Sequence, residues 1–579
     1  MGEKPMRMNK RWEVRPEPGK EILKSFGDIP KPIARALFHR GIYDAESACV
    51  FINPAADIPP DPYLMADMET AVDRIRQAIR SGDPIVIYGD YDADGVTATA
   101  MLVDYFSSLG AKASAYIPSR FEEGYGLNCA AIQSLAGQGA KVIVSVDCGA
   151  RSVEEAELSR SLGVDLIITD HHAPGDVHPP ALAFLDPKRV DCRYPDKNLA
   201  GVGVAYRFLQ AIANTLDEGG GSQPEEYLDL VAIGTVADMA PLLGENRSLV
   251  RAGLNRLNQP ASGSLRTGVE QLLQVAGVSR GKINATAIGF LIGPRLNAAG
   301  RIDTANTALR LLLTRDSREA QEYASLLDAR NRERQTLTRA TFAEARRIML
   351  ERQASASGEI PYFIMIEQAE FNAGVIGLAA SKMMEEFYRP SAVVTMDGEY
   401  ARGSIRSIPG FHITEALESC HQLLDRYGGH AAAAGFTVRV DRLPELYRQL
   451  EQRARESLGG QALQPVLTID SEVTLPELTW DFLGWLNKME PFGQGNPAPI
   501  FSASGVQVVS RRTVGKESAH LKLTLTDSKT RFDAIGFGFG ARADTLPPVI
   551  NVAFSLEEND YYGKQLQMRI IDIQDPSTA

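Results

Sequence analysis

The chain has 579 residues, which is too many for one hydrophobic core, so two to four domains are expected. Its hydrophobic content of 44% and charged content of 23% are typical of a soluble globular protein. No apolar stretch reaches the roughly 18 residues that cross a bilayer, which excludes a membrane-spanning class. The net charge of −12 argues against a nucleic-acid partner. That argument is weak, because metal-binding acids count toward the sum and a local basic groove does not show in it.

The first part of the chain predicts a small helical segment, residues 1–75, without an export signal. Residues 1–20 are charged, contain proline and lack the apolar run of a signal peptide. Residues 58–62 form a proline-rich, irregular connection. The cysteines are scattered without metal-like pairing, which is typical of reduced thiols in a cytoplasmic protein. They are Cys49, Cys129, Cys148, Cys192 and Cys420.

Residues 76–304 are predicted to form an α/β domain with a mostly parallel sheet, because strand-like runs alternate with helical patterns. Helices are expected at 96–107 and 153–162, and the run 181–185, which ends at Asp186, is an expected strand. Three other apolar runs deliver acids or histidines at their carboxyl ends. Residues 84–88 lead to Asp90, Asp92 and Asp94, residues 142–146 to Asp147, and residues 164–169 to Asp170, His171 and His172.

These strand ends predict a site for divalent metal ions. An open parallel sheet places its ligands at the carboxyl ends of its strands. Carboxylates that converge there without Lys or Arg repel one another unless cations neutralise them. A fourth acid, Asp238, follows the apolar segment 233–237. Oxygen-rich ligation with one or two imidazoles suits Mn²⁺ or Mg²⁺. Several carboxylates around a shared Asp would hold two ions about 3.5–4 Å apart, an arrangement that hydrolyses phosphate esters.

The string from Asp90 to Gly95 also resembles the start of an EF-hand loop, but that interpretation fails. An EF-hand needs Glu at its twelfth position and flanking helices. The twelfth residue counted from Asp90 is Met101, and a strand-like run precedes the string.

The rest of the chain predicts connecting helices and two further domains. Residues 305–357 favour one or two long helices, whose many arginines form either a solvated face or a wall for an anionic ligand. Residues 358–460 return to α/β character, with strands expected at 363–366 and 391–395 and a helix at 376–387. Residues 461–579 predict a small β-barrel of about five strands. Its expected strands are 506–509, 520–526, 532–537, 550–556 and 565–573.

Over nearly its whole length the chain resembles the DHH phosphoesterase superfamily and, within it, the RecJ exonuclease family. Four strings look like the metal motifs: Tyr88-Gly-Asp-Tyr-Asp-Ala-Asp-Gly95, Ser145-Val-Asp-Cys-Gly149, Thr169-Asp-His-His172 and Gly234-Thr-Val-Ala-Asp-Met-Ala-Pro-Leu242. Two resemble further RecJ signatures: Leu199-Ala-Gly-Val-Gly203 and Gly293-Pro-Arg-Leu-Asn-Ala-Ala-Gly-Arg301. Three resemble the DHHA1 domain: Gly374-Val-Ile-Gly377, Gly403-Ser-Ile-Arg-Ser407 and Gly428-Gly-His-Ala-Ala-Ala-Ala-Gly435. Pro491-Phe-Gly-Gln-Gly-Asn-Pro497 opens a segment that resembles the RecJ oligonucleotide-binding (OB) barrel.

The resemblance implies a role for each residue of the metal motifs. One ion would be held by Asp92 with help from Asp90. Asp147 would bridge this ion to a second one. The remaining ligands of the second ion would be Asp94, His171 and Asp238.

The other two residues of the third motif have different implied roles. His172 would contact the scissile phosphate or support the ligands from behind, and Asp170 would orient an imidazole rather than bind metal. The residues implied in catalysis are therefore Asp147, His171 and His172.

Several residues are candidates for holding phosphate groups. The DHHA1 resemblance implies Ser404, Arg406, Gly428, Gly429 and His430. The glycines also have physical sense as a phosphate seat, because backbone N–H groups approach closely where no Cβ intrudes. A close-packed helix start is the alternative explanation of that segment.

Three arginines are further candidates for contacting nucleic acid. Arg295 and Arg301 bracket a loop of small residues and could fork a phosphate, and Arg120 could contact DNA. A surface ion pair is the rival explanation for each of them.

One departure from the family pattern is visible. RecJ relatives usually carry Trp-His just before the Gly-Val-Ile-Gly segment, whereas this chain has Phe371-Asn372. Asn can hydrogen-bond a phosphate but cannot become cationic. Nucleotide grip by that loop, or its pH dependence, is therefore expected to differ.

The resemblance implies a 5′-to-3′ exonuclease of single-stranded DNA that uses two Mn²⁺ or Mg²⁺ ions and releases 5′-mononucleotides. Its two α/β lobes would face each other across a groove too narrow for duplex. A helicase and a single-strand-binding protein are expected partners, and a cytoplasmic monomer is the expected state. Two alternatives stay open. One is a DHH enzyme for oligoribonucleotides, cyclic dinucleotides or pyrophosphate, and the other is an inactive nucleic-acid-binding scaffold.

Overall fold

The computed structural model describes residues 10–53, 59–118, 126–215, 221–259, 265–302, 305–355, 358–460, 462–559 and 563–576, without the side chains of 299–302. The chain divides into two compact units. The first contains residues 1–12 and 329–467, and the second contains residues 13–328 and 468–579. Among the described helices, none has the length and apolar character that a membrane span requires.

A five-stranded parallel sheet forms the core of the second unit, in the order β3-β2-β4-β5-β6. Strands β2 and β4 are buried along their whole length, as expected when helices cover both faces of a parallel sheet. The parallel sheet predicted for residues 76–304 is thus confirmed. Its strands are β2 (Ile85–Gly89), β3 (Ala113–Tyr116), β4 (Val142–Val146), β5 (Asp165–Thr169) and β6 (Ala183–Leu185).

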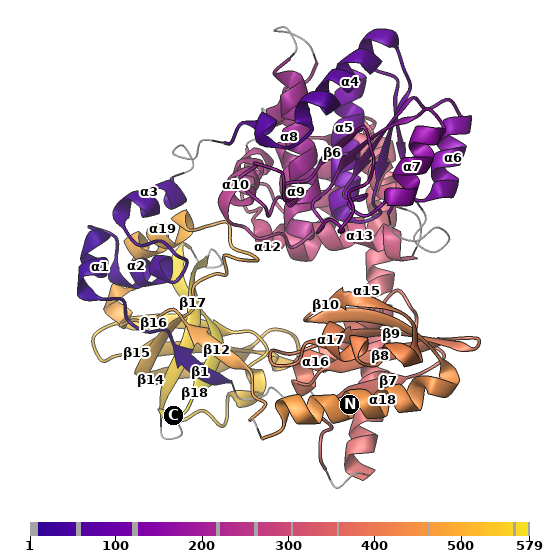
Figure 1. The fold of residues 1–579 in the computed structure, drawn as a ribbon. Coiled ribbons are helices and arrows are strands. Elements are labelled where there is room, and N and C mark those ends of the chain that lie inside the picture. The colour runs from indigo at the N-terminus through magenta and orange to yellow at the C-terminus, as the bar shows by residue number, and fades with distance from the viewer. Residues whose placement is uncertain are drawn as a thin grey trace. The chain divides into compact units, whose positions relative to one another are not determined.

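Alternate residues of these strands enter two separate cores. Ile85 and Ile87 pack with helices α4, α5, α8 and α9 on one face, whereas Val86 and Tyr88 pack with α6 and α7 on the other. Figure 1 shows the sheet lying between these two helical layers. The helices are α4 (Met68–Ser81), α5 (Ala93–Ser108), α6 (Cys129–Gly137), α7 (Val153–Ser161), α8 (Gly201–Ala213) and α9 (Leu228–Ala237). Helix α4 therefore runs across the boundary predicted at residue 75.

A group of helices extends this layer toward the long connection. They are α10 (Gly244–Asn258), α11 (Thr267–Ala276), α12 (Ala285–Ala287), the π-helical turn η4 (Ile288–Ile292), α13 (Gly293–Ile302) and α14 (Asn306–Leu313). The connection itself is α15 (Ser317–Ser355), a helix of 39 residues that passes from the second unit into the first. The long helices predicted for this region are confirmed.

The first unit contains a mixed sheet in the order β10-β11-β9-β8-β7. Helix α16 and part of α15 cover one face, and α17 and α18 cover the other. The strands are β7 (Ile364–Glu367), β8 (Ser391–Asp397), β9 (Tyr400–Arg406), β10 (Leu424–His430) and β11 (Ala433–Arg439). The helices are α16 (Ile376–Phe387), α17 (Ile413–Glu418) and α18 (Leu443–Leu458). A separate two-stranded sheet joins β1 (Arg11–Val14) to β12 (Val466–Ile469).

The C-terminal strands form a barrel, because β14 pairs with both β15 and β17 and so closes the sheet. The predicted small barrel is confirmed, with β13 (Ser471–Glu472), β14 (Phe501–Val514), β15 (His520–Thr526), β16 (Arg531–Gly536), β17 (Val549–Asn559) and β18 (Gln565–Gln574). Residues from the start of the chain share its core, so Phe26, Ile33 and Leu37 pack with barrel residues. The helices at this end of the barrel core are α1 (Lys20–Ser25), α2 (Lys31–Phe38), α3 (Ala45–Ile52) and α19 (Trp480–Lys488).

Candidate metal centre

Four neighbouring strands of the parallel sheet end at the same level, and an aspartate follows each of them. Gly89 pairs with Val146, Val146 with Thr169, and Thr169 with Leu185. The residues that come next along the four strands are Asp90, Asp147, Asp170 and Asp186. The register of the sheet therefore gathers carboxylates at one edge, as the strand pattern predicted.

Helix α5 brings two more carboxylates to this edge. Asp92 caps the helix, since its Oδ1 accepts hydrogen bonds from the backbone N–H of Asp94 at 2.9 Å and of Gly95 at 3.2 Å. A Cβ on Gly95 would lie 2.6 Å from the carbonyl oxygen of Asp90, so only glycine allows the loop to fold this tightly. The loop is also held by Asn297 on α13, whose Oδ1 accepts from Ala93 N–H at 2.7 Å.

Asp94 is held at the start of another helix. Its two oxygens accept from the backbone N–H groups of Gly201 and Val202, both at 2.8 Å, in the first turn of α8. A Cβ on Gly201 would lie 2.7 Å from Asp147 Oδ1. The glycine at position 201 of the Leu-Ala-Gly-Val-Gly string therefore lets the start of α8 approach the carboxylates of Asp94 and Asp147.

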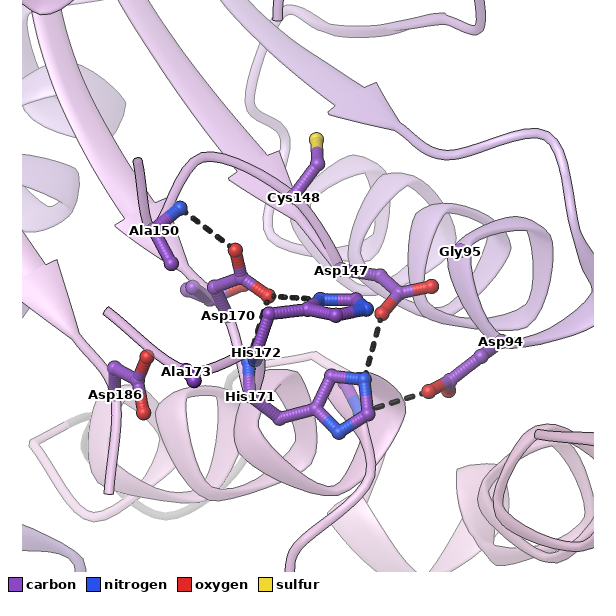
Figure 2. A network of polar contacts seen from close by, with 12 residues as sticks. Asp94, Gly95, Asp147, Cys148, Ala150, Asp170, His171, His172, Ala173 and Asp186 are labelled. Carbon is purple, nitrogen blue, oxygen red and sulfur yellow. Dashed lines mark hydrogen bonds and ion pairs between the residues drawn. The ribbon is translucent and has the colours of Figure 1, made fainter. Parts of the chain in front are cut away.

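The imidazole of His171 lies between Asp94 and Asp147 (Figure 2). Its Nε2 is 3.1 Å from Asp147 Oδ1 and 3.9 Å from Oδ2 of Asp238, the residue that caps the end of α9. Three sets of side chains each bring ligand atoms within 4.8 Å of one another. The sets are Asp90, Asp92 and Asp147; Asp94, His171 and Asp238; and Asp147, His171 and His172.

Burial and mutual repulsion shift the proton affinities of this cluster. The pKa values of Asp94 and Asp147 are raised well above the usual range, first by burial and then by the neighbouring carboxylates. Burial, with the charge of Asp92, raises the pKa of Asp238 to about 7. Burial, with the charge of His172, lowers the pKa of His171 to about 4, so this imidazole is neutral at physiological pH. An imidazole must be neutral to bind a cation. A bound cation would also relieve the repulsion between the crowded carboxylates.

Asp170 belongs to none of these sets. Its Oδ1 accepts from the backbone N–H of His171 at 2.7 Å and lies 2.8 Å from His172 Nδ1, and its Oδ2 accepts from Ala150 N–H at 2.7 Å (Figure 2). Burial opposes ionisation of Asp170, but the hydrogen bond and charge of His172 outweigh it and lower the carboxyl pKa. Burial likewise opposes the charge on His172, and Asp170 outweighs it and raises the imidazole pKa. Asp170 and His172 therefore form an ion pair beside the cluster.

Asp186 is a residue that the strand pattern located without suggesting a role. It is fully buried, its Oδ1 accepts from Lys188 N–H at 2.7 Å, and its Oδ2 has no hydrogen-bond partner among the described residues. Burial raises the pKa of its carboxyl to about 7. Its place directly after the fourth strand is the signal that could have grouped Asp186 with the other strand-end aspartates.

None of the three arginine candidates is placed at the metal centre among the described residues. Arg295 forms an ion pair with Asp328, with Nε and Nη2 at 3.0 and 2.9 Å from the same oxygen, and its Nη1 donates to the Leu291 carbonyl at 2.6 Å. The geometry thus favours the rival explanation, an ion pair, although this pair is largely buried rather than on the surface. Arg120 and the side chain of Arg301 lie outside the described residues.

The phosphate candidates of the first unit lie on strands, which excludes the helix start considered for residues 428–431. Ser404 and Arg406 lie on β9, and Gly428, Gly429 and His430 lie on β10. Gly435 of β11 pairs with both Gly428 and Ser404, and Ala433 pairs with both His430 and Arg406.

Because paired residues share a face and alternate residues do too, four of the five candidates lie on one face of the sheet. These four are Ser404, Arg406, Gly428 and His430. The start of α16 covers part of this face, since a Cβ on Gly377 would lie 3.0 Å from Ser404 Oγ and 3.3 Å from Arg406 Nη2. Gly429 has φ 146° and lies on the opposite face.

The Phe371-Asn372 departure lies just before α16. Phe371 is buried in the core between α16 and the sheet, and Asn372 Oδ1 accepts from Gly374 N–H at 2.8 Å. Asn372 thus closes the turn that leads into α16.

Comparisons with known proteins agree with this architecture. Residues 84–235 match the DHH family N-terminal domain, residues 359–456 the DHHA1 domain, and residues 469–572 the RecJ OB domain. The fold and the acidic centre therefore define a protein of the DHH class.

Relatives narrow the class further. The chain is 38% identical to the single-stranded-DNA-specific exonuclease RecJ of Bacillus subtilis over 97% of its own length and 70% of the relative. It is 35% identical to the Escherichia coli protein of that name, over 88% of this chain and 90% of the relative. The crystal structure of Thermus thermophilus RecJ in complex with Mn²⁺ matches with a TM-score of 0.81 and 31% identity, covering 98% of this chain and 80% of that one. The chain belongs to the RecJ family.

Proposed function

We propose that the protein is a 5′-to-3′ exonuclease that hydrolyses single-stranded DNA with two divalent metal ions and releases 5′-mononucleotides. The observation that carries this proposal is the group of acids around His171, with two separate sets of ligands that adjoin through Asp147. Membership of the RecJ family supports the substrate, because several relatives bear the name of single-stranded-DNA-specific exonuclease.

The residues of the centre fit two hard cations. One ion would be held by Asp90, Asp92 and Asp147, and the other by Asp94, His171 and Asp238, with Asp147 shared. Oxygen donors with a neutral imidazole suit Mn²⁺ or Mg²⁺, and the RecJ structure from Thermus thermophilus is a complex with Mn²⁺. When bound, such a pair activates a water molecule and stabilises the departing 3′ oxygen of a phosphodiester.

The chain's own residues would orient the reacting groups. The α8 amides fix both oxygens of Asp94, so this carboxylate cannot rotate away from His171. The ion pair with Asp170 keeps a proton on His172, whose side chain is 48% exposed and can donate to a phosphate oxygen. Positioned donors of this kind are most effective where charge develops in the transition state.

The other domains would hold the DNA. The face of the first unit's sheet that carries Ser404, Arg406 and His430 offers hydroxyl, guanidinium and imidazole donors for a terminal phosphate. The barrel would hold the strand further along by base stacking and positive charge, as OB folds do. A DHH enzyme for dinucleotides would not need such a barrel.

The expected setting follows from the family. The protein would act in DNA repair and recombination in the cytoplasm, as a monomer that works with a helicase and a single-strand-binding protein. The resemblance to RecJ proteins supports this setting.

Release of nucleotides from a long 5′-phosphorylated single strand tests the proposal. With Mn²⁺ we expect processive release of 5′-mononucleotides from the wild type, and a loss of at least about a thousandfold for Asp147→Asn, in line with removal of a shared metal ligand. Asp186→Asn is the matched control, since it alters a buried carboxylate at a neighbouring strand end outside the ligand sets. Equal release by the wild type and Asp147→Asn would contradict the mechanism, and preference for a dinucleotide over the long strand would contradict the substrate.

A further inference from the structure

The barrel segment Pro491–Pro497, here called the 491–497 loop, lies against the chain that leaves the metal centre. Helix α9 ends at Ala237 with Asp238 as its cap. The next residues, here called the 239–243 segment, lead to α10. Leu242 N–H donates to the Gln494 carbonyl at 2.7 Å. The loop of the barrel domain is thus hydrogen-bonded to Leu242 of the catalytic domain, four residues after the carboxylate of Asp238.

The contact between loop and segment leaves no room for side chains. A Cβ on Gly493 would lie 2.7 Å from Leu242 Cδ1, and one on Gly495 would lie 3.2 Å from both Pro241 Cβ and Leu243 Cδ1. Gly495 also has φ 74°, a conformation that residues with a Cβ rarely adopt. Two glycines therefore let the loop pack directly on the segment.

Buried polar groups hold the loop in shape. Asn496 is fully buried, its Nδ2 donates to the carbonyls of Met489 at 3.0 Å and Pro491 at 2.9 Å, and its Oδ1 accepts from Arg40 Nε at 2.9 Å. Arg247 of α10 donates to the Pro491 carbonyl at 3.4 Å. The loop is a rigid support rather than a loose connection, because each of these groups would be left without a bond if it moved.

The segment needs such a support. Met239 has φ 61° and its side chain is 68% exposed, so the chain turns sharply just after Asp238 with little packing of its own. Within the catalytic domain, Asn246 donates to the Pro241 carbonyl at 3.1 Å from the other side. The segment is thus clamped between α10 and the 491–497 loop.

We propose that the 491–497 loop positions Asp238, so that the barrel sets the affinity of the catalytic centre for its metal ions. This inference rests on the proposed two-metal function. Groups that orient a metal ligand typically contribute about 10–100-fold to metal affinity or activity. The loop acts through the 239–243 segment and touches neither substrate nor metal, so its residues are positioning residues.

The test compares Gly495→Ala with Gly505→Ala. Both glycines belong to the barrel region and have similar positive φ, 74° and 66°, but a Cβ on Gly505 meets nothing within 4 Å. Mn²⁺ binding to the metal-free protein is measured by electron paramagnetic resonance of the free ion. We expect binding about tenfold weaker for Gly495→Ala and unchanged for Gly505→Ala, with the nuclease rate of Gly495→Ala restored by raised Mn²⁺.

Other outcomes separate the two hypotheses. If the wild type binds Mn²⁺ and Gly495→Ala binds it equally well, the positioning role is wrong and the proposed function stands. A rate deficit that extra Mn²⁺ does not relieve also overturns the positioning role. If the wild type does not bind Mn²⁺, the proposed function itself fails. Should Gly495→Ala not fold, Gly493→Ala replaces it, because Gly493 has no positive φ and its added methyl still presses on Leu242 of the segment. The same weakening of Mn²⁺ binding is then expected, and its absence overturns the inference.

Discussion

Replacing the buried carboxylate of Asp186 should stabilise the metal-free protein at high pH. The side chain is fully buried, and its Oδ2 has no hydrogen-bond partner among the described residues. Burial raises its carboxyl pKa from 3.8 to about 7. Folding must therefore either desolvate a charge or take up a proton. Asp186→Asn removes this requirement and keeps an oxygen for the Lys188 amide.

The size and sign of the effect follow from the two pKa values. Because the folded-state pKa is the higher one, stability falls as pH rises from about 4 to about 7, and the loss is complete above that window. At 1.36 kcal/mol per pK unit, the penalty for the wild type is about 1.7 kcal/mol at pH 5 and about 4 kcal/mol at pH 8. The variant should therefore gain about 2.5 kcal/mol relative to the wild type between pH 5 and pH 8. Any cost of burying the Asn amide is the same at both pH values and cancels.

Urea unfolding of both proteins in EDTA at pH 5 and pH 8 measures this difference. Asp481→Asn, which replaces an exposed carboxylate on α19 outside the metal centre, is the control for the substitution itself. A difference for Asp186→Asn that stays constant between pH 5 and pH 8 would refute the reasoning, because it would mean that Asp186 is not protonated on folding.

Further predictions concern the metal centre and the Arg295 ion pair. Mn²⁺ at about a hundred times its dissociation constant should stabilise the wild type by about 2.7 kcal/mol per ion. Thermal unfolding with Mn²⁺ and with EDTA should show that Mn²⁺ stabilises Asp238→Asn less than it stabilises the wild type. Equal stabilisation of both proteins would contradict the assignment of Asp238. Gly201→Ala places a methyl group 2.7 Å from Asp147 Oδ1 and should lower nuclease activity at least about tenfold, whereas Gly137→Ala, whose added Cβ meets nothing within 4 Å, should not. Arg295→Gln and Asp328→Asn should each lower the free energy of unfolding by about 2–4 kcal/mol, and the double variant by less than the sum. Weaker DNA binding by Arg295→Gln without loss of stability would instead indicate a phosphate contact.

The local pattern of the chain predicted the elements whose residues interact with near neighbours. Apolar runs of five or six residues marked β2, β4 and β5, and the aspartates that follow these runs marked the edge where the metal centre forms. The composition of 305–357 marked α14 and α15, and regular alternation marked the barrel strands. These features depend on burial and periodicity, which the sequence displays directly.

The remaining features depend on partners far away in the sequence. Strand β3, Ala113–Tyr116, was not predicted because its small, half-buried side chains lack a continuous apolar run. The sequence offers a phosphate seat or a helix start for residues 428–431, and the strand β10 is not apparent because its glycines acquire strand character only by pairing with β11. The ion pair of Arg295 needs Asp328, and the close fit of Gly201 needs Asp147, and neither partner is marked by spacing.

The shared core of the N-terminal helices and the barrel has a consequence for biosynthesis. Leu37 and Ile33 are synthesised long before Phe554 and Ile570, which belong to the same core. Contacts between segments so far apart in the sequence form slowly, because closing so long a loop loses much conformational entropy before any contact is gained. During translation, the apolar side of helices α1–α3 therefore stays exposed until the barrel strands are made. A chain released before β18 is made would keep that side exposed to chaperones and proteases.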